Sequence, residues 1–228
     1  VACANEWKHG ICYKPQIKCS DCKSRQLLPI TQEVLYSHLT GQKVIGIYPL
    51  LATDQCRLLA VDFDKSDWKN CVTAFSEACL SLNIPFLVER SRSGNGAHVW
   101  IFFSEPIAAK QARLMGAGIL DKAMELYPAL DFESYDRMFP NQDHMPAGGF
   151  GNLIALPLQK HARALGNSTF IDSNFNAFTD PWTVLQQTEL MSSSEVNNIV
   201  NELGYNFIEQ NQTDVDHEAP WVKNIPKK

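Results

Sequence analysis

The stretch that decides the fold is Arg57-Leu58-Leu59-Ala60-Val61-Asp62-Phe63-Asp64. Its four apolar residues, 58–61, are bounded by polar ones, which is the pattern of a short strand buried in a core. Successive side chains of a strand point to opposite faces, so Asp62 and Asp64 share one face, with Cα atoms roughly 6.5 Å apart. Two carboxylates at this spacing favour a divalent-metal site; solvated acids ahead of a helix cap are the alternative.

Length and composition indicate one globular domain with a small appendage. The chain has 228 residues, of which 45% are hydrophobic and 20% charged, as in ordinary globular proteins. It contains no run of eighteen apolar residues and no visible signal peptide, so we expect a cytoplasmic protein without a membrane span. Because the first residue is Val1 rather than Met, we also expect a fragment of a longer protein.

Charge is unevenly distributed along the chain. The net charge of −5 argues weakly against nucleic-acid binding, because phosphate contacts need Lys and Arg. Residues 1–25, however, hold five Lys and Arg against two acids, whereas residues 183–228 hold seven acids against three Lys. A basic end that contacts phosphate and an acidic end that faces water are therefore both compatible with this sequence.

Cysteine spacing predicts a zinc site at the start of the chain. The spacing C-x8-C-x6-C-x2-C is formed by Cys3, Cys12, Cys19 and Cys22. Four thiolates complete a tetrahedral zinc site, and a segment this short needs a metal to supply most of its folding energy. Free or redox-active thiols are the alternative. We expect structural rather than catalytic zinc, and we expect Cys56, Cys71 and Cys79 to lie in the core.

Local patterns predict alternating helices and strands over residues 31–203. Apolar residues at helical spacing, such as Trp68, Val72 and Phe75, indicate helices that pack against a sheet. We expect helices over 31–40, 66–82, 108–126 and 192–203, and strands over 44–49, 57–63, 86–88, 98–103 and within 152–159. We expect strands 44–49 and 57–63 to pair as a hairpin. This order predicts the α+β class, as an α/β sandwich.

A glycine-rich turn between two strands is a candidate phosphate site. It is formed by Ser93, Gly94, Asn95 and Gly96. Glycine lets backbone N–H groups approach an anion, and the neighbouring Arg90, Arg92 and His98 are able to pair with phosphate. The alternative is a plain hairpin turn with solvated arginines.

A later segment offers more acids and then more cations. The acids are Asp131, Glu133, Asp136 and Asp143. A third carboxylate near Asp62 would bridge two metal ions, although acid-rich surface loops are common. A strand then ends at Gln159, and cations beyond it, beginning with Lys160, are candidates to hold a triphosphate tail.

Taken in order, these segments resemble the archaeo-eukaryotic primase (AEP) superfamily, and most closely the primase domain of TOTE conflict systems and CRISPR-associated primase-polymerases. The resemblance covers roughly residues 1–185. It is carried by the four cysteines and by GIYPLL (46–51), AVDFD (60–64), RSRSGNGAHVWIFF (90–103), SYDRMFPNQD (134–143) and GGFGNLIALPLQ (148–159).

The resemblance implies a DNA primase-polymerase that makes or extends primers from dNTPs or NTPs by two-metal catalysis. It implies a zinc-binding segment (1–28), a catalytic domain (29–208) with an RRM-like sheet and a smaller α/β unit, and a polar tail (209–228). Two Mg²⁺ or Mn²⁺ ions and one structural Zn²⁺ are the implied cofactors. Single-stranded DNA template, primer, nucleotides, and CRISPR adaptation or other defence proteins are the implied partners.

The resemblance also assigns residue roles. Asp62 and Asp64 match the first, metal-binding motif, His98 matches the triphosphate-contacting second motif, and Asp136 matches the third carboxylate. Asp131, Glu133 and Asp143 remain alternatives for that carboxylate. The second motif often begins with Ser two residues before the histidine, where this chain has Gly96, so a backbone N–H takes the hydroxyl's place there. The implied nucleotide-binding residues are Arg90, Arg92, Ser93, Gly94, Asn95, Gly96, His98, Gln159 and Lys160.

Three other functions remain open from the sequence. Another Asp-x-Asp transferase, such as a sugar-nucleotide enzyme, uses the same metal chemistry. A zinc-containing nucleic-acid-binding module without polymerase activity would keep the acids as structural groups, and its binding would depend on salt. A nuclease would use the same carboxylates to degrade nucleic acid without added nucleotide.

Overall fold

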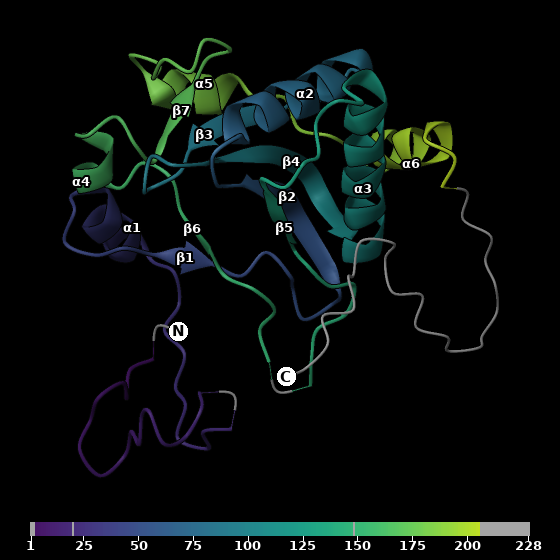
Figure 1. The fold of residues 1–228 in the computed structure, drawn as a ribbon. Coiled ribbons are helices and arrows are strands. Elements are labelled where there is room, and N and C mark those ends of the chain that lie inside the picture. The colour runs from purple at the N-terminus through teal and green to yellow at the C-terminus, as the bar shows by residue number, and fades with distance from the viewer. Residues whose placement is uncertain (1–2, 20, 148, 206–228) are drawn as a thin grey trace, which may run out of the picture.

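The fold is built on a five-stranded antiparallel sheet with the order β5-β2-β4-β3-β7 (Figure 1). The structure is a computed structural model that describes residues 3–19, 21–147 and 149–205. The strands are β2 (Gln55–Phe63), β3 (Leu87–Arg90), β4 (Ala97–Ala108), β5 (Tyr135–Phe139) and β7 (Thr169–Ile171). The stretch 57–63 thus belongs to an interior strand, β2, and the expected α+β class is confirmed.

One face of the sheet carries the main core. Three helices contribute to this core: α2 (Trp68–Ser81), α3 (Ala109–Leu126) and α6 (Ser193–Glu202) (Figure 1). From β2, the side chains of Leu59, Val61 and Phe63 are fully buried in this layer. Because side chains alternate along a strand, Ala60 and Asp62 point to the opposite face.

The opposite face of the sheet carries a smaller layer. It contains the two-stranded sheet of β1 (Gly46–Ile47) and β6 (Ile154–Ala155), with α1 (Gln32–Leu39), α4 (Lys160–Arg163) and α5 (Pro181–Gln187). A second buried cluster joins this layer to the sheet through Ala60, Trp100, Phe139, Ile154, Leu158 and Phe170. Buried His38 contacts the Pro157 carbonyl at 2.9 Å and so fixes α1 to this layer.

The expected hairpin of 44–49 with 57–63 is wrong. β1 pairs with β6, with Gly46 opposite Ala155, and both edges of β2 are occupied by β4 and β5. Because neither edge of β2 is free, β1 pairs with the later strand β6 instead. The hydrophobic patterns identified the strands but did not identify their partners.

Short-range signals predicted the helix starts well. Thr31 accepts a hydrogen bond from the Val34 amide at the start of α1, and Gly41, with φ of +87°, follows its end. Ser192 and Glu195 form the expected capping box of α6. The expected polar tail, 209–228, lies outside the described residues.

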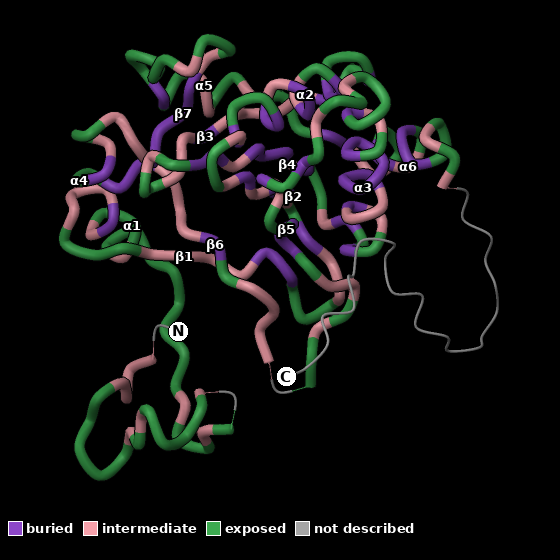
Figure 2. Tube along the Cα trace, in the orientation of Figure 1, coloured by how far each residue is buried: buried purple, intermediate pink, exposed green. Residues whose placement is uncertain are grey.

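Over residues 3–19 and 21–27 the chain forms turns and one isolated bridge between Cys3 and Leu27, and most of these residues are exposed (Figure 2). Trp7 is 70% exposed, so the segment has little apolar core of its own. It meets the main body where the Arg25 guanidinium lies 4.3 Å from the centre of the Phe150 ring. Among the helices of the described ranges, none has the length and apolar character needed to cross a membrane.

Candidate active site

A row of polar side chains crosses the sheet on the face opposite α2 and α3. Strand register places Glu89 of β3 opposite His98 of β4, His98 opposite Asp62 of β2, and Asp62 opposite Arg137 of β5. Directly opposed residues of antiparallel strands have Cβ atoms only about 4.5–5.5 Å apart, so neighbours in the row interact. We call these four residues the charged row.

Asp62 and His98 form the centre of the charged row. The His98 Nε2 atom lies 3.4 Å from Asp62 Oδ1, and the side chains are 14% and 19% exposed respectively. Both groups are therefore mostly buried yet reachable from solvent. Burial raises the pKa of Asp62; His98 lowers it, and the nearby carboxylates of Asp136 and Asp64 raise it further.

A β-bulge brings Asp136 toward Asp62. Asp62 pairs with Arg137 and Phe63 pairs with Tyr135, so Asp136 is an extra residue on β5 at this point. Bulges redirect the side chains of the strand that contains them. The electrostatic effect of Asp136 on the pKa of Asp62 indicates that the two carboxylates are near each other.

Asp64 lies just beyond the end of β2. Its backbone N–H donates to the Ser134 carbonyl at 2.8 Å, which fixes the chain next to β5. Its Oδ1 atom is buried, and within the described part of the chain it has no hydrogen-bond partner. A buried carboxylate oxygen without a partner is costly, and a bound cation would satisfy it.

The other candidate acids have different partners. Asp143 pairs with Arg113 of α3. Asp131 accepts a hydrogen bond from the Glu133 amide at 3.0 Å and helps to raise the pKa of Cys71 on α2. The geometry therefore favours Asp136 over these acids as the third carboxylate.

Arg137 is a site residue that the sequence analysis missed. Its Nε donates to Asp136 Oδ2 at 2.5 Å, and this hydrogen bond is the main reason that the pKa of Arg137 is raised. Asp62 and Asp64 raise the Arg137 pKa as well, so the guanidinium lies in the field of all three carboxylates. A basic residue directly after an acid was visible in the sequence, but only strand register shows that it faces Asp62.

Glu89 is the second residue that was missed. It is 2% exposed, and its carboxylate contacts the ring of His98 at 2.9 Å. Burial lowers the pKa of His98, but hydrogen bonding and charge from Glu89, together with Asp62, raise it overall. An acid directly after the apolar residues 86–88 was the available signal.

The glycine-rich turn contacts the end of β2. A Cβ atom on Gly96 would lie 2.4 Å from the Phe63 carbonyl oxygen, so only glycine fits between the loop and β2. Gly94 has φ of +82°, and Ser93 Oγ accepts a hydrogen bond from the Asn95 amide at 3.2 Å. Arg92 is exposed beside this turn.

The other predicted nucleotide-binding residues, Arg90, Gln159 and Lys160, lie at the end of β3 and at the start of α4. The Arg90 guanidinium donates to the carbonyls of Phe175 at 2.5 Å and Gly166 at 3.4 Å. Buried Gln159 accepts from the Ala162 amide and caps α4, whose first residue is the exposed Lys160. Arg90 and Gln159 thus have structural contacts here.

Substituting Gly96 with Ala is expected to destabilise the domain by about 1–3 kcal/mol, the usual cost of inserting a methyl group into a filled space. The new Cβ would contact the Phe63 carbonyl and push the loop away from Asp64. Chemical denaturation would measure the loss. An unchanged free energy of unfolding would contradict the close contact at Gly96.

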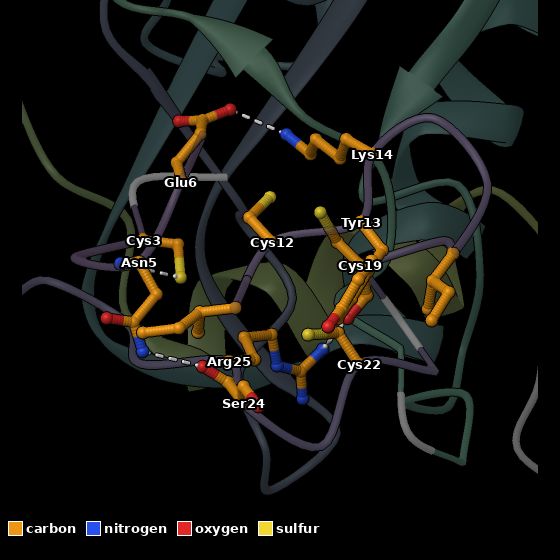
Figure 3. A pocket seen from close by; sticks show the side chains of 12 residues that line it. Cys3, Asn5, Glu6, Cys12, Tyr13, Lys14, Cys19, Cys22, Ser24 and Arg25 are labelled. Carbon is orange, nitrogen blue, oxygen red and sulfur yellow. Dashed lines mark hydrogen bonds and ion pairs between the residues drawn. The ribbon is translucent and has the colours of Figure 1, made fainter. Parts of the chain in front are cut away.

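The four N-terminal cysteines line one cavity (Figure 3). All four are free thiols. The amides of Gln26 and Asn5 donate to Cys3 Sγ at 3.3 and 3.4 Å, and these bonds lower the pKa of the Cys3 thiol. Four sulfur atoms around one cavity are the kind of donor set that structural zinc uses.

Neither the four N-terminal cysteines nor the acids near Asp62 are arranged with the geometry of a metal site. Within residues 3–19, 21–147 and 149–205, no group of three or more His, Cys, Asp or Glu side chains has the geometry to hold a metal ion. Like charges repel one another, so such side chains approach closely only when a cation lies between them. Both places have the residue types that the predicted metals use as ligands. Metal binding requires tight coordination geometry in addition.

Comparison with known proteins identifies the family. No curated protein matches the chain. A family model described as the TOTE conflict system, archaeo-eukaryotic primase domain, matches residues 1–199. The match includes the cysteine segment, the charged row and the glycine-rich turn, and it confirms the resemblance seen in the sequence. The chain therefore belongs to the archaeo-eukaryotic primase domain family of TOTE conflict systems.

Proposed function

We propose that this chain is a primase-polymerase that makes or extends primers on a single-stranded DNA template from dNTPs or NTPs. The observation that carries the proposal is the contact of Asp62 with His98 and of the glycine-rich turn with the end of β2, together with Asp64 and Asp136, whose charges raise the pKa of Asp62. Family membership supports the same class of chemistry, nucleotidyl transfer.

The carboxylates of Asp62, Asp64 and Asp136 would hold two Mg²⁺ or Mn²⁺ ions. When bound, the ions would lower the pKa of the attacking 3′-hydroxyl and neutralise charge on the leaving pyrophosphate. On the other side of the nucleotide, the amides of residues 93–96 and the cations Arg92, His98 and Lys160 would hold the phosphates. Phosphoryl transfer depends mainly on such positioning and charge neutralisation.

The remaining assignments follow from the same proposal. Residues 1–28 would form a zinc-binding segment held by the four cysteines, and 29–208 would form the catalytic domain. Arg25 next to Phe150 supports a fixed link between the two. Template, primer and nucleotides are the proposed partners, and the TOTE family supports a role beside other defence proteins.

Incubating the chain with labelled nucleotides and Mn²⁺ tests the proposal directly. One sample contains a bare single-stranded template and a second contains a primed template. Incorporation on either template is the expected result, and product on the bare template would indicate primer synthesis. Salt-sensitive DNA binding without incorporation would instead support the nucleic-acid-binding module, and degradation without nucleotide would support a nuclease.

A single substitution tests the third carboxylate. Asp136→Asn is expected to reduce incorporation by about 10²–10³-fold, the usual effect of losing one group that stabilises charge in a transition state. The matched control is Glu133→Gln, which neutralises an exposed acid three residues away. Steady-state primer extension measures both variants. A larger loss in Glu133→Gln than in Asp136→Asn would move the assignment to Glu133.

A further inference from the structure

Glu89 is a buried carboxylate that three donors surround. Its Oε2 atom contacts His98 Nδ1 at 2.9 Å and accepts a hydrogen bond from Trp100 Nε1 at 3.0 Å. Its Oε1 atom accepts a hydrogen bond from Ser168 Oγ at 3.3 Å. Glutamate is rarely buried to 2% exposure unless it is paired. The burial of Glu89 therefore indicates a specific role for its side chain.

We propose that Glu89 is a positioning residue that fixes the orientation of the His98 ring. A carboxylate accepts hydrogen bonds, so the ring donates Nδ1–H to Glu89. The other ring nitrogen, Nε2, then faces the carboxylate site, where it lies 3.4 Å from Asp62 Oδ1. This inference rests on the proposed function, in which His98 contacts the triphosphate of the incoming nucleotide.

The contacts of Glu89 connect His98 to the segment that lies against the glycine-rich turn. Ser168 comes directly before β7, and its carbonyl accepts a hydrogen bond from the Leu158 amide at 2.6 Å. The next residue back, Asn167, lies against Gly94 of the glycine-rich turn. One carboxylate therefore connects β4, β3 and the α4–β7 loop, the three elements around the proposed phosphate site.

Of the three donors to Glu89, His98 is the one whose orientation bears on the proposed chemistry. Trp100 and Ser168 are themselves buried and contact Glu89 away from Asp62. A purely structural role would make all three hydrogen bonds contribute to folding alone. A positioning role adds a measurable effect on nucleotide binding that passes through His98.

The test is Glu89→Gln in the full chain, compared with Ser168→Ala. Glutamine keeps the shape of the side chain but removes its charge, so the hydrogen bond from His98 Nδ1 is expected to weaken and the ring to lose its single orientation. The KM for nucleotide is expected to rise about 10–100-fold, as when a carboxylate that orients a functional histidine is lost. Ser168→Ala removes a donor from the other carboxylate oxygen, Oε1, and leaves the contact of Oε2 with His98 in place, so it is expected to change KM by less than about twofold.

Two readouts separate positioning from packing. Nitrogen-15 shifts of the His98 ring, measured without nucleotide, report the hydrogen bond of Nδ1 directly; a strongly hydrogen-bonded Nδ1–H in the parent that weakens in Glu89→Gln supports the proposal. A double-mutant cycle with His98→Gln is the second readout. If Glu89 acts through His98, Glu89→Gln has no further effect on KM in the His98→Gln background.

An unchanged Nδ1 shift in Glu89→Gln, or effects on KM that add fully in the double variant, would overturn the proposal. If Glu89→Gln fails to fold, Glu89→Asp replaces it, because the shorter side chain withdraws the carboxylate from His98. Absence of nucleotide incorporation by the parent chain would reject the proposed function. The nitrogen-15 shifts would still decide whether Glu89 orients His98.

Discussion

Replacing Asp62 and Asp64 together with Asn is expected to abolish nucleotide incorporation and to leave the thermal midpoint equal to or above that of the parent. Both side chains would lose the charge that holds the metal ions, so the loss of rate should exceed the ~10²–10³-fold effect of losing one such group. Primer extension with Mg²⁺ and with Mn²⁺ measures the activity.

The stability part of this prediction follows from the sign of the Asp62 shift. Burial raises the pKa of Asp62, and the nearby carboxylates of Asp136 and Asp64 raise it further, although His98 opposes this. A carboxyl group with a raised pKa binds its proton more tightly when folded, so its ionisation destabilises the fold as the pH rises above the unfolded pKa. Asparagine cannot ionise, and removing the charges relieves this cost near neutral pH.

A second measurement and a control make the result specific. Mn²⁺ is expected to raise the melting temperature of the parent, because a ligand that binds only the native state stabilises it, and to leave the double variant unchanged. Asp131→Asn with Glu133→Gln removes the same number of charges from two exposed acids near the site. Incorporation by the Asp62/Asp64 variant, or an equal loss in the control, would show that the acid assignment is wrong.

Sequence reasoning succeeded where the information was local. The strand at 57–63, the helix starts at Thr31 and Ser192, and the helical stripes all arise from contacts within a few residues. The pairing of β1 failed because it depends on β6, more than one hundred residues later. Hydrophobic alternation says which face of a strand is buried, and it leaves the neighbour of the strand undetermined.

The same distinction explains the candidate site. Asp62, Asp64 and His98 were visible because each belongs to a short pattern at the end of a strand. Glu89 and Arg137 were not, because their importance comes from register across four strands, which places them at the two ends of the charged row. Asp136 is an intermediate case. The sequence offered it as one of four candidate acids, and the β-bulge at Asp136 distinguishes it from the other three.

The N-terminal segment illustrates how a metal is able to replace a core. Its large apolar side chains are exposed, with Tyr13 at 54% and Ile17 at 43%, so hydrophobic burial contributes little to its folding. Structural zinc sites contribute about 10–16 kcal/mol in small domains near neutral pH, which is enough to order such a segment. The four cysteines around one cavity are the residues that would receive this ion.

Cys19→Ser with Cys22→Ser is therefore expected to lower bound zinc from one ion per chain to none and to make residues 3–28 sensitive to protease. The sheet should keep its melting temperature, because its buried clusters contain no residue from this segment. We also expect primer initiation on a bare template to fall before extension of a primed one. Metal analysis, limited proteolysis and the two template assays measure these effects.

Cys56→Ala is the matched control, because Cys56 is fully buried in the main core and its pKa is raised by burial to about 12. The Cys56→Ala variant is expected to keep its bound zinc and to melt at a lower temperature than the parent. The Cys19/Cys22 variant is expected to lose its zinc and to keep the melting temperature of the sheet. A cavity of one sulfur atom in a packed core costs stability without affecting a distant segment. If the Cys19/Cys22 variant retained zinc, the ion would be held by other residues; if its sheet melted early, the segment would belong to the cooperative core of the domain.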